Sequence, residues 1–134
     1  MRIKAPVYTV IFIFGLIGLL LVGLFVPGII GKSESAKFKA TQAQLNRLSN
    51  AIIVFHSDVG ELPSSLESLL SNKQRFEDWN GPYITKGSLV SPWDSRYVYE
   101  YNGPVFRVMS YGKDNKPGGE EFDADLVVQS NVDE

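Results

Sequence analysis

Apolar residues are distributed unevenly along the chain, with one long uninterrupted block near its start. From Val7 to Ile30 the chain is apolar apart from Tyr8 and Thr9, and residues 5–30 carry no charge. As a helix, these residues would extend about 36 Å, enough to cross a hydrocarbon core of about 30 Å. The pattern therefore predicts a membrane-spanning helix within residues 1–31.

A cleaved secretory signal is the alternative for this block, because Arg2 and Lys4 give it a short basic start. The apolar stretch of such a signal is typically about 7–15 residues long, and this one is much longer. The length favours a retained anchor. Pro27 removes one backbone donor within the span and predicts a kink near the membrane end.

The following segment, residues 33–58, has the periodicity of an amphipathic helix. Its apolar positions are separated by three, four or seven residues, as on one face of a helix. They are Phe38, Leu45, Leu48, Ile52, Phe55 and then Val59. Gly60 and Pro63 are expected to end the helix. His56 has no cysteine or second histidine to accompany it, so it is interpreted as structural or solvent-facing.

Two short patterns predict further elements. Residues 64–70 follow Pro63 and predict a short helix with a serine cap. Residues 97–101 and 105–111 predict two strands around Asn102-Gly103, a strong hairpin signal. The chain is thus expected to be an α+β protein with a long helix and a small antiparallel sheet.

Aromatic residues gather in the loop of residues 76–93, between the short helix and the hairpin. We expect these rings to cover the long helix. The alternative is a role for Trp79, Tyr83 or Trp93 in stacking on a carbohydrate or a base.

Composition narrows the classes of function. The 134 residues include 13 Lys and Arg, 15 Asp and Glu and no Cys, for a net charge of -2. Without cysteine there is no disulfide framework, thiolate zinc site or cysteine nucleophile. No basic cluster suits phosphates, so nucleic acid is not an expected partner. Neither a nucleophile with an adjacent base nor a phosphate-binding glycine loop occurs, so we expect no enzyme and no small-molecule substrate.

Candidate chemistry lies in the acidic loop after the hairpin. Residues 112–119 are rich in glycine and turn-forming residues and lead into Glu120-Glu121-Phe122-Asp123-Ala124-Asp125-Leu126. If this segment is extended, Asp123 and Asp125 point to one side and Phe122 to the core. The glycines would let the loop fold Asp114 back onto the two carboxylates.

A bound cation would relieve the repulsion between carboxylates placed this close together. Calcium suits such a loop because it accepts about 6–8 oxygen ligands in flexible geometry, whereas magnesium requires tighter octahedral geometry. The spacing is not that of an EF-hand. The residues alone leave two interpretations open, a calcium site and a plain solvated acidic loop.

The order of these elements resembles the major pseudopilin family of the bacterial type II secretion system. The segments that carry the resemblance are Asp58-Val59-Gly60-Glu61-Leu62-Pro63-Ser64-Ser65, Trp79-Asn80-Gly81-Pro82-Tyr83, Ser91-Pro92-Trp93, Ser110-Tyr111-Gly112-Lys113-Asp114, Gly118-Gly119 and Asp123-Ala124-Asp125. The resemblance implies a type IV pilin-like α+β fold, with a long N-terminal helix packed on a small antiparallel sheet. It also implies a calcium ion (Ca2+) held by the side chains of Asp114, Asp123 and Asp125 and the carbonyl of Tyr111.

The same resemblance implies a location and partners. Residues 1–31 would be a single-pass anchor in the bacterial inner membrane with a cytoplasmic N-terminus, and residues 32–134 a periplasmic globular domain. The expected partners are the inner membrane, further copies of the chain or other pseudopilins, and components of the secretion system. Family members polymerise through their N-terminal helices into a short pseudopilus.

The N-terminus departs from the pattern of this family. The family has a glycine before the prepilin peptidase cut and a glutamate five residues after it. In the best alignment, Val7 takes the place of the glycine and Phe12 that of the glutamate. Peptidase processing and the glutamate's intersubunit contact are therefore not carried over. A second hypothesis follows, in which the chain is a non-polymerising, single-pass periplasmic binding or accessory module that reuses the fold.

Overall fold

The computed structural model of the chain describes residues 33–133. Residues 36–134 belong to one compact unit. Within the described range, no helix is both long and apolar enough to cross a membrane. The predicted membrane-spanning segment, with Pro27, Val7 and Phe12, lies outside the described residues.

The long helix, residues 33–59, confirms the amphipathic prediction over its described length. Leu45, Leu48, Ile52 and Phe55 on its predicted apolar face are all at most 1% exposed. The helix ends at Gly60, which has a φ of 84°. Its N–H donates to the carbonyl of His56 over 2.8 Å. A glycine suits this end because a left-handed conformation costs it little.

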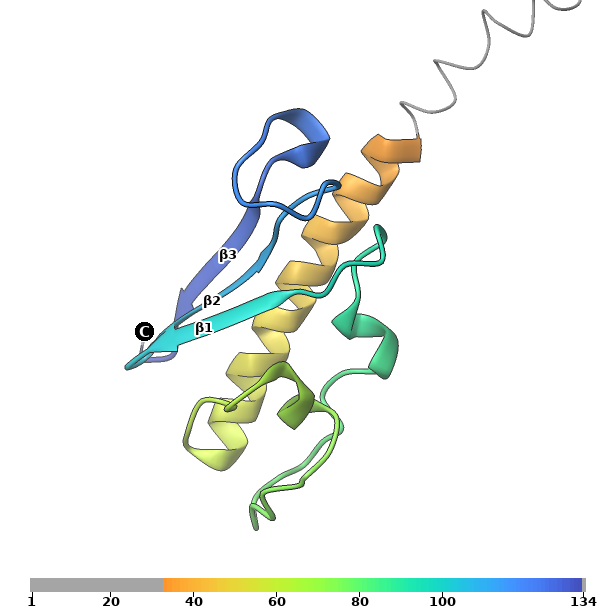
Figure 1. The fold of residues 1–134 in the computed structure, drawn as a ribbon. Coiled ribbons are helices and arrows are strands. Elements are labelled where there is room, and N and C mark those ends of the chain that lie inside the picture. Colours follow the sequence, from red (N-terminus) through yellow and green to blue (C-terminus); the bar gives the residue numbers. More distant parts are fainter. Residues whose placement is uncertain (1–32, 134) are drawn as a thin grey trace, which may run out of the picture. The chain divides into compact units, whose positions relative to one another are not determined.

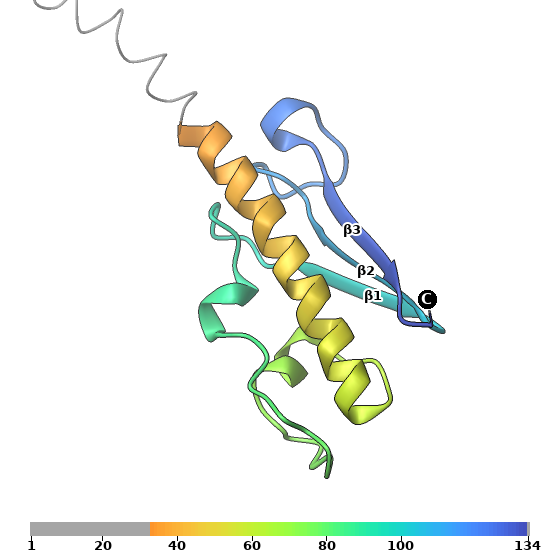
Figure 2. The same cartoon turned by 180° about the vertical axis from the view of Figure 1, so that it is seen from behind.

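The sheet consists of β1 (Val98–Asn102), β2 (Val105–Ser110) and β3 (Leu126–Asn131). The strands are antiparallel in the order β1-β2-β3. One face of the sheet packs on the long helix (Figures 1 and 2), and Phe106 and Val108 are buried there with the helix residues. The α+β architecture of a helix on an antiparallel sheet is thereby confirmed.

The predicted hairpin is present, but its turn lies one residue later than expected. Asn102 pairs with Val105 as the last residue of β1, so Gly103-Pro104 form the turn. Gly103 has a φ of 58°. A two-residue turn with glycine first is typical of type II′, and its twist matches that of the strands. The prediction that Asn102-Gly103 are the two turn residues was wrong. The observed turn places Gly103 first, where a positive φ favours glycine, and Asn102 pairs as part of β1 instead.

Short 3-10 helices connect the long helix to the sheet. The first, η1 (Leu66–Leu69), lies within the predicted short helix. The predicted serine cap was wrong, because the side chain of Ser65 at the N-cap makes no capping hydrogen bond. The burial of Leu66 and Leu69 against the core holds the segment instead. A second, η2 (Lys86–Leu89), occurs where the sequence predicted only loop.

The aromatic loop covers the C-terminal end of the long helix, as predicted. Phe55 contacts the rings of Phe76 and Tyr83 edge to face, with centroids 5.9 and 5.5 Å apart. The Tyr83 hydroxyl donates to Oδ2 of Asp58 over 2.8 Å and so ties the loop to the helix. Burial raises the pKa of this hydroxyl. Trp79 packs edge to face on Tyr83 at 5.6 Å.

Tyr97 gives the core a titratable group. Its side chain is 7% exposed, and its hydroxyl donates to Oε1 of Gln44 over 2.6 Å. Burial raises the pKa of Tyr97 to about 12, whereas an unfolded tyrosine titrates near 10. The unfolded chain therefore loses this proton first as the pH rises. The stability that Tyr97 contributes is complete below pH 10 and is lost between about pH 10 and 12.

We expect the free energy of unfolding of Tyr97→Phe to fall less between about pH 10 and 12 than that of the wild type, because the mutant has no hydroxyl to ionise at this position. Urea unfolding at a series of pH values from 8 to 12 measures the effect. The matched control is Tyr101→Phe, since Tyr101 is 51% exposed. Burial also raises the pKa of Tyr99, so part of the loss should remain. An unchanged profile in Tyr97→Phe would contradict the assignment.

Candidate functional site

The acidic loop predicted to carry chemistry joins β2 to β3 and spans residues 111–125. It begins at Tyr111, directly after β2, and includes the short helix η3 (Glu121–Asp123). The Phe122 ring lies edge to face on Phe38 of the long helix, with centroids 6.2 Å apart. The loop is thus held at the end of the sheet that lies toward the start of the described helix (Figure 1).

Two glycines close the loop over the backbone of Asp123. Gly112 has a φ of 65° and Gly119 a φ of 92°, both in the left-handed region. A Cβ atom at Gly112 would lie 2.6 Å from the Asp123 carbonyl oxygen, and one at Gly119 would lie 2.5 Å from it. The N–H of Lys113 also donates to the carbonyl of Phe122 over 2.8 Å. Glycine is required at both positions because no side chain fits there.

The carboxylates of the loop take part in hydrogen bonds from its own backbone. Oδ1 of Asp114 accepts from the N–H of Lys116 over 3.1 Å, and Oδ2 of Asp125 accepts from the N–H of Gly118 over 3.0 Å. Asp125 is exposed and Asp123 is half-buried. The Asp114 bond is local, whereas the Asp125 bond ties the end of the loop back to Gly118 in its middle.

The conformation that the sequence suggested for this segment was wrong in its first part. Residues 121–123 form a helical turn, and Glu121 has a φ of 53°, so side chains do not alternate there. An extended backbone begins only at Ala124, with φ -62° and ψ 143°. The glycine contacts curl the chain and remove the geometric reason for placing Asp123 and Asp125 on one side. Phe122 nevertheless packs on the helix, as expected.

The predicted calcium ligands fit that ion in kind. Tyr111, Asp114, Asp123 and Asp125 would supply carboxylate and carbonyl oxygens, the donors that calcium prefers. Within residues 33–133, no three acidic or histidine side chains converge closely enough to hold a metal ion. The ligand set stays a prediction. Sequence reasoning missed these glycine contacts. The only signal for them was the presence of Gly112 and Gly119 on either side of one turn-rich segment.

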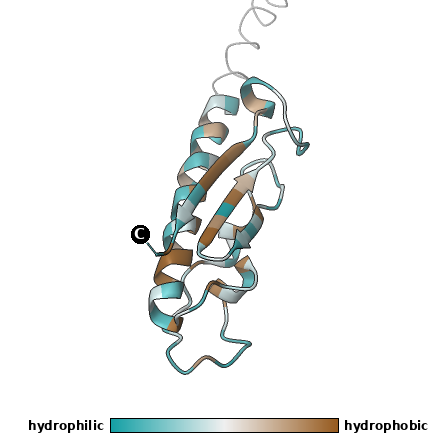
Figure 3. Cartoon of the chain, turned by 90° about the vertical axis from the view of Figure 1, so that its left-hand side faces the viewer, coloured by the Kyte–Doolittle hydropathy of each residue, from teal (hydrophilic) through white to brown (hydrophobic). Residues whose placement is uncertain are grey.

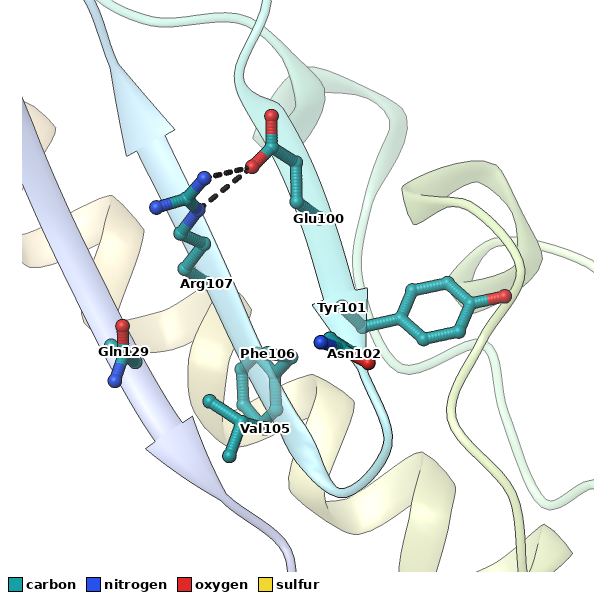
Figure 4. Close-up of a pocket in the computed structure, with 7 residues that line it drawn as sticks. All are labelled: Glu100, Tyr101, Asn102, Val105, Phe106, Arg107 and Gln129. Carbon is teal, nitrogen blue, oxygen red and sulfur yellow. Dashed lines mark hydrogen bonds and ion pairs between the residues drawn. The ribbon is translucent and has the colours of Figure 1, made fainter.

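A second surface feature lies on the outer face of the sheet, away from the long helix. A hollow of about 290 Å³ is lined there by Glu100, Val105, Arg107 and Gln129 among others (Figure 4). Nε of Arg107 donates to Oε2 of Glu100 over 2.7 Å. This ion pair neutralises the centre of the face, since the two charges cancel.

His56, half-buried, lines a separate hollow with Glu61 and Asp133.

Together, the amphipathic helix, the three-stranded antiparallel sheet and the glycine-closed loop before its last strand form an α+β architecture compatible with a pilin-like fold. Residues 28–129 match the family described as type II secretion system (T2SS), protein G. The chain belongs to this family, and the resemblance inferred from its motifs is confirmed.

Two relatives show how closely the chain matches named members. The type II secretion system core protein G of Xanthomonas campestris pv. campestris is 32% identical over 103 residues, which cover 75% of this chain and 72% of the relative. The type II secretion system core protein G of Pseudomonas aeruginosa is 28% identical over 115 residues, which cover 80% of this chain and 81% of the relative.

Proposed function

We propose that the chain is a pseudopilin-like structural subunit of a type II secretion system. The single observation that carries this proposal is the family match over residues 28–129, which includes the long helix, most of the sheet and the acidic loop. The names of both relatives, type II secretion system core protein G, support a role in protein transport. No catalytic step, nucleic acid or small-molecule substrate is part of the proposal.

The proposed location is the bacterial inner membrane. Residues 1–31 would form a single-pass anchor with a cytoplasmic N-terminus, and residues 32–134 a periplasmic domain. The uncharged block of residues 5–30 supports this arrangement, because its length matches a hydrocarbon core. The proposed partners are copies of this chain or other pseudopilins, together with further components of the secretion system.

We further propose that calcium stabilises the acidic loop through the side chains of Asp114, Asp123 and Asp125 and the carbonyl of Tyr111. Two observations support this proposal, the type of the donor atoms and the compactness of the loop. The donors are all oxygen, and the contacts of Gly112 and Gly119 keep the loop compact around Asp123.

Co-purification from the native membrane tests the secretion role. We expect a tagged full-length chain to retain other secretion-system components after mild solubilisation while secretion is active. A point variant of an exposed residue, such as Lys73→Ala, serves as the matched control. Recovery of the chain only as a dispersed monomer under these conditions would contradict incorporation into the apparatus.

The second candidate function is a non-polymerising accessory module, and Val7 and Phe12 favour it. A buried carboxylate in lipid is costly and is expected to need a partner such as a neighbouring amino terminus. This chain lacks both that carboxylate and the glycine before the cut. The two absences are consistent, because without cleavage there is no new amino terminus for a carboxylate to pair with.

We therefore expect the mature protein to keep residues 2–7. Intact-mass measurement on protein isolated from its native membrane checks this directly. The unprocessed chain of 134 residues has a mass of 14.9 kDa. A species that lacks residues 1–7 would show that cleavage proceeds without the glycine and would remove the main reason for the accessory role.

A further inference from the structure

Two hollows lie next to each other along η1 and the loop that follows it. The first hollow, of about 220 Å³, is lined mostly by hydroxyl and amide side chains and by the ring of Trp79. These polar residues are Ser64, Ser65, Ser68, Ser71, Asn72 and Gln74. The loop after η1 lies lowest in Figure 1, and Figure 3 shows it as mainly hydrophilic. All of these residues lie outside the acidic loop, so the calcium proposal gives them no role.

The second hollow, of about 200 Å³, adjoins the first. It shares Ser64, Ser65 and Glu67 with the first hollow and extends to Tyr97 and Tyr99. A ligand that lies across Ser64 and Ser65 therefore enters both hollows. Each hollow is smaller than most ligand pockets, which measure about 300–1,000 Å³. A chain of repeated small units, with one unit in each hollow, fits this arrangement better than one compact molecule.

Hydrogen bonds order the polar side chains of the first hollow. Nε2 of Gln74 donates to Oγ of Ser64 over 3.1 Å, and the hydroxyl oxygens of Ser64 and Ser68 lie 3.3 Å apart. Asn72 fixes the turn beside them, because its side-chain amide bonds both the N–H and the carbonyl of Phe76, over 2.8 and 2.7 Å. A serine hydroxyl has one donor and two lone pairs. Ser64 and Ser68 therefore keep capacity to bond a ligand.

Trp79 is held in a fixed position although it borders the first hollow. Its ring packs edge to face on Tyr83, and a Cβ atom at Gly81 would lie 2.6 Å from its Cζ2 atom. Its indole N–H donates to the carbonyl of Ser68 over 3.4 Å. A ring that is already held loses little further freedom when a ligand binds. A ring beside hydroxyl groups suits a sugar, whose C–H groups pack on the aromatic face while its own hydroxyls form hydrogen bonds.

The charges in the hollows favour a neutral ligand. Nη1 of Arg96 donates to Oε1 of Glu67 over 3.1 Å, so the two opposite charges of the second hollow cancel. The residues that line the two hollows include no cluster of basic side chains. A phosphate or nucleic acid, which needs such a cluster, is therefore a poor match.

Tyr99 contributes a polar atom that lacks a partner. Its hydroxyl is shielded from solvent and makes no hydrogen bond within residues 33–133. Buried hydroxyls are rarely left unpaired, because the missing hydrogen bond costs free energy. A hydroxyl-bearing ligand in the second hollow, which Tyr99 lines, would supply that bond after a small shift of the hollow's wall. This observation again indicates a ligand rich in hydroxyl groups.

We propose that the two hollows together bind a neutral polysaccharide chain of β-linked sugar units. Trp79 packs on one sugar ring, and Ser64, Ser68 and Gln74 form hydrogen bonds with its hydroxyl groups. Linkages between equatorial positions make such a chain extended, which suits two hollows in a row, whereas α-linked chains curve. Binding requires neither polymerisation nor calcium, so its failure would leave the proposed secretion role standing.

The probes are cellotetraose and chitotetraose, two neutral β-linked tetrasaccharides, titrated into the full-length chain in a zwitterionic detergent without a sugar headgroup. Calorimetry measures the affinity. Trp93→Phe leaves Trp79 as the sole tryptophan, whose fluorescence reports contact with its ring. We expect saturable binding of at least one probe with a change in Trp79 emission, and much weaker binding of the α-linked maltotetraose. Binding of neither probe at millimolar concentration, equal binding of maltotetraose, or binding without a change in Trp79 emission would overturn the proposal.

Tyr99→Phe tests the second hollow. We expect it to bind the tetrasaccharide several-fold more weakly without a lower thermal midpoint, because its hydroxyl has no partner to lose in the free protein. Unweakened binding would overturn the assignment of both hollows to one ligand.

Ser64→Ala/Gln74→Ala tests the first hollow by removing two hydrogen-bonding side chains. The matched control, Ser57→Ala/Gln42→Ala, deletes the same atoms from the long helix. All four positions are exposed, so both variants should fold. We expect the first variant to bind the tetrasaccharide about tenfold more weakly, as the loss of two hydrogen bonds implies, and the control to bind as the wild type does. Equal binding by the two variants would overturn the proposal.

Discussion

Phe55→Ala is expected to lower the free energy of unfolding by about 3–5 kcal/mol, the usual cost of deleting a buried aromatic ring. Phe55 is 1% exposed and contacts Phe76 and Tyr83 edge to face. Such ring pairs add about 0.5–1.5 kcal/mol beyond the area that they bury. The mutation removes both contacts at once and opens a cavity between the long helix and the aromatic loop.

Chemical unfolding of residues 32–134 expressed alone measures this loss. Val54→Ala is the control, because Val54 is the preceding helical residue and is 49% exposed. Its effect should remain within about 0.5 kcal/mol. A loss below about 1 kcal/mol in Phe55→Ala would mean that the aromatic loop is not part of the folded core.

Local periodicity explains why the helix was predictable in detail. Each position of its buried face lies within one or two turns of the next. The sequence of residues 33–58 is therefore sufficient to predict which side chains are buried. The strand β3 was not predicted as a strand, although residues 126–131 pair fully with β2. Its partner lies about twenty residues earlier, and no turn signal of two residues connects them. Pairing across such a distance depends on the rest of the core.

The acidic loop was likewise predictable in part: its ligand-type residues could be predicted and its conformation could not. Its composition identified oxygen donors and glycines, and the family motif identified the same positions. Its conformation was not predictable, because Glu121 and Asn115 adopt φ values of 53° and 54°. Left-handed conformations are uncommon in residues other than glycine and cost energy unless surrounding contacts impose them. Here the packing of Phe122 on Phe38 and of the glycines on Asp123 imposes the turn.

Calcium is expected to stabilise the folded chain in proportion to the logarithm of its concentration above the dissociation constant. At a hundredfold excess the gain is about 2.7 kcal/mol for one site that binds the folded state alone. The thermal midpoint of residues 32–134, measured with increasing calcium after chelator treatment, checks this expectation. Magnesium at equal concentration should give a smaller shift, because its octahedral geometry suits a flexible loop poorly.

Asp123→Ala/Asp125→Ala should remove the response to calcium, since two of the three predicted carboxylate ligands are lost. The matched control, Glu77→Ala/Asp78→Ala, deletes the same charge from two exposed residues outside the loop and should respond as the wild type does. The readout is the difference between midpoints with and without calcium, so any change in intrinsic stability cancels. Asp125→Ala also removes the acceptor for the Gly118 N–H, which lowers the midpoint equally with and without calcium. A wild-type midpoint that does not move at millimolar calcium would leave the loop as a plain solvated acidic turn, closed by its glycines.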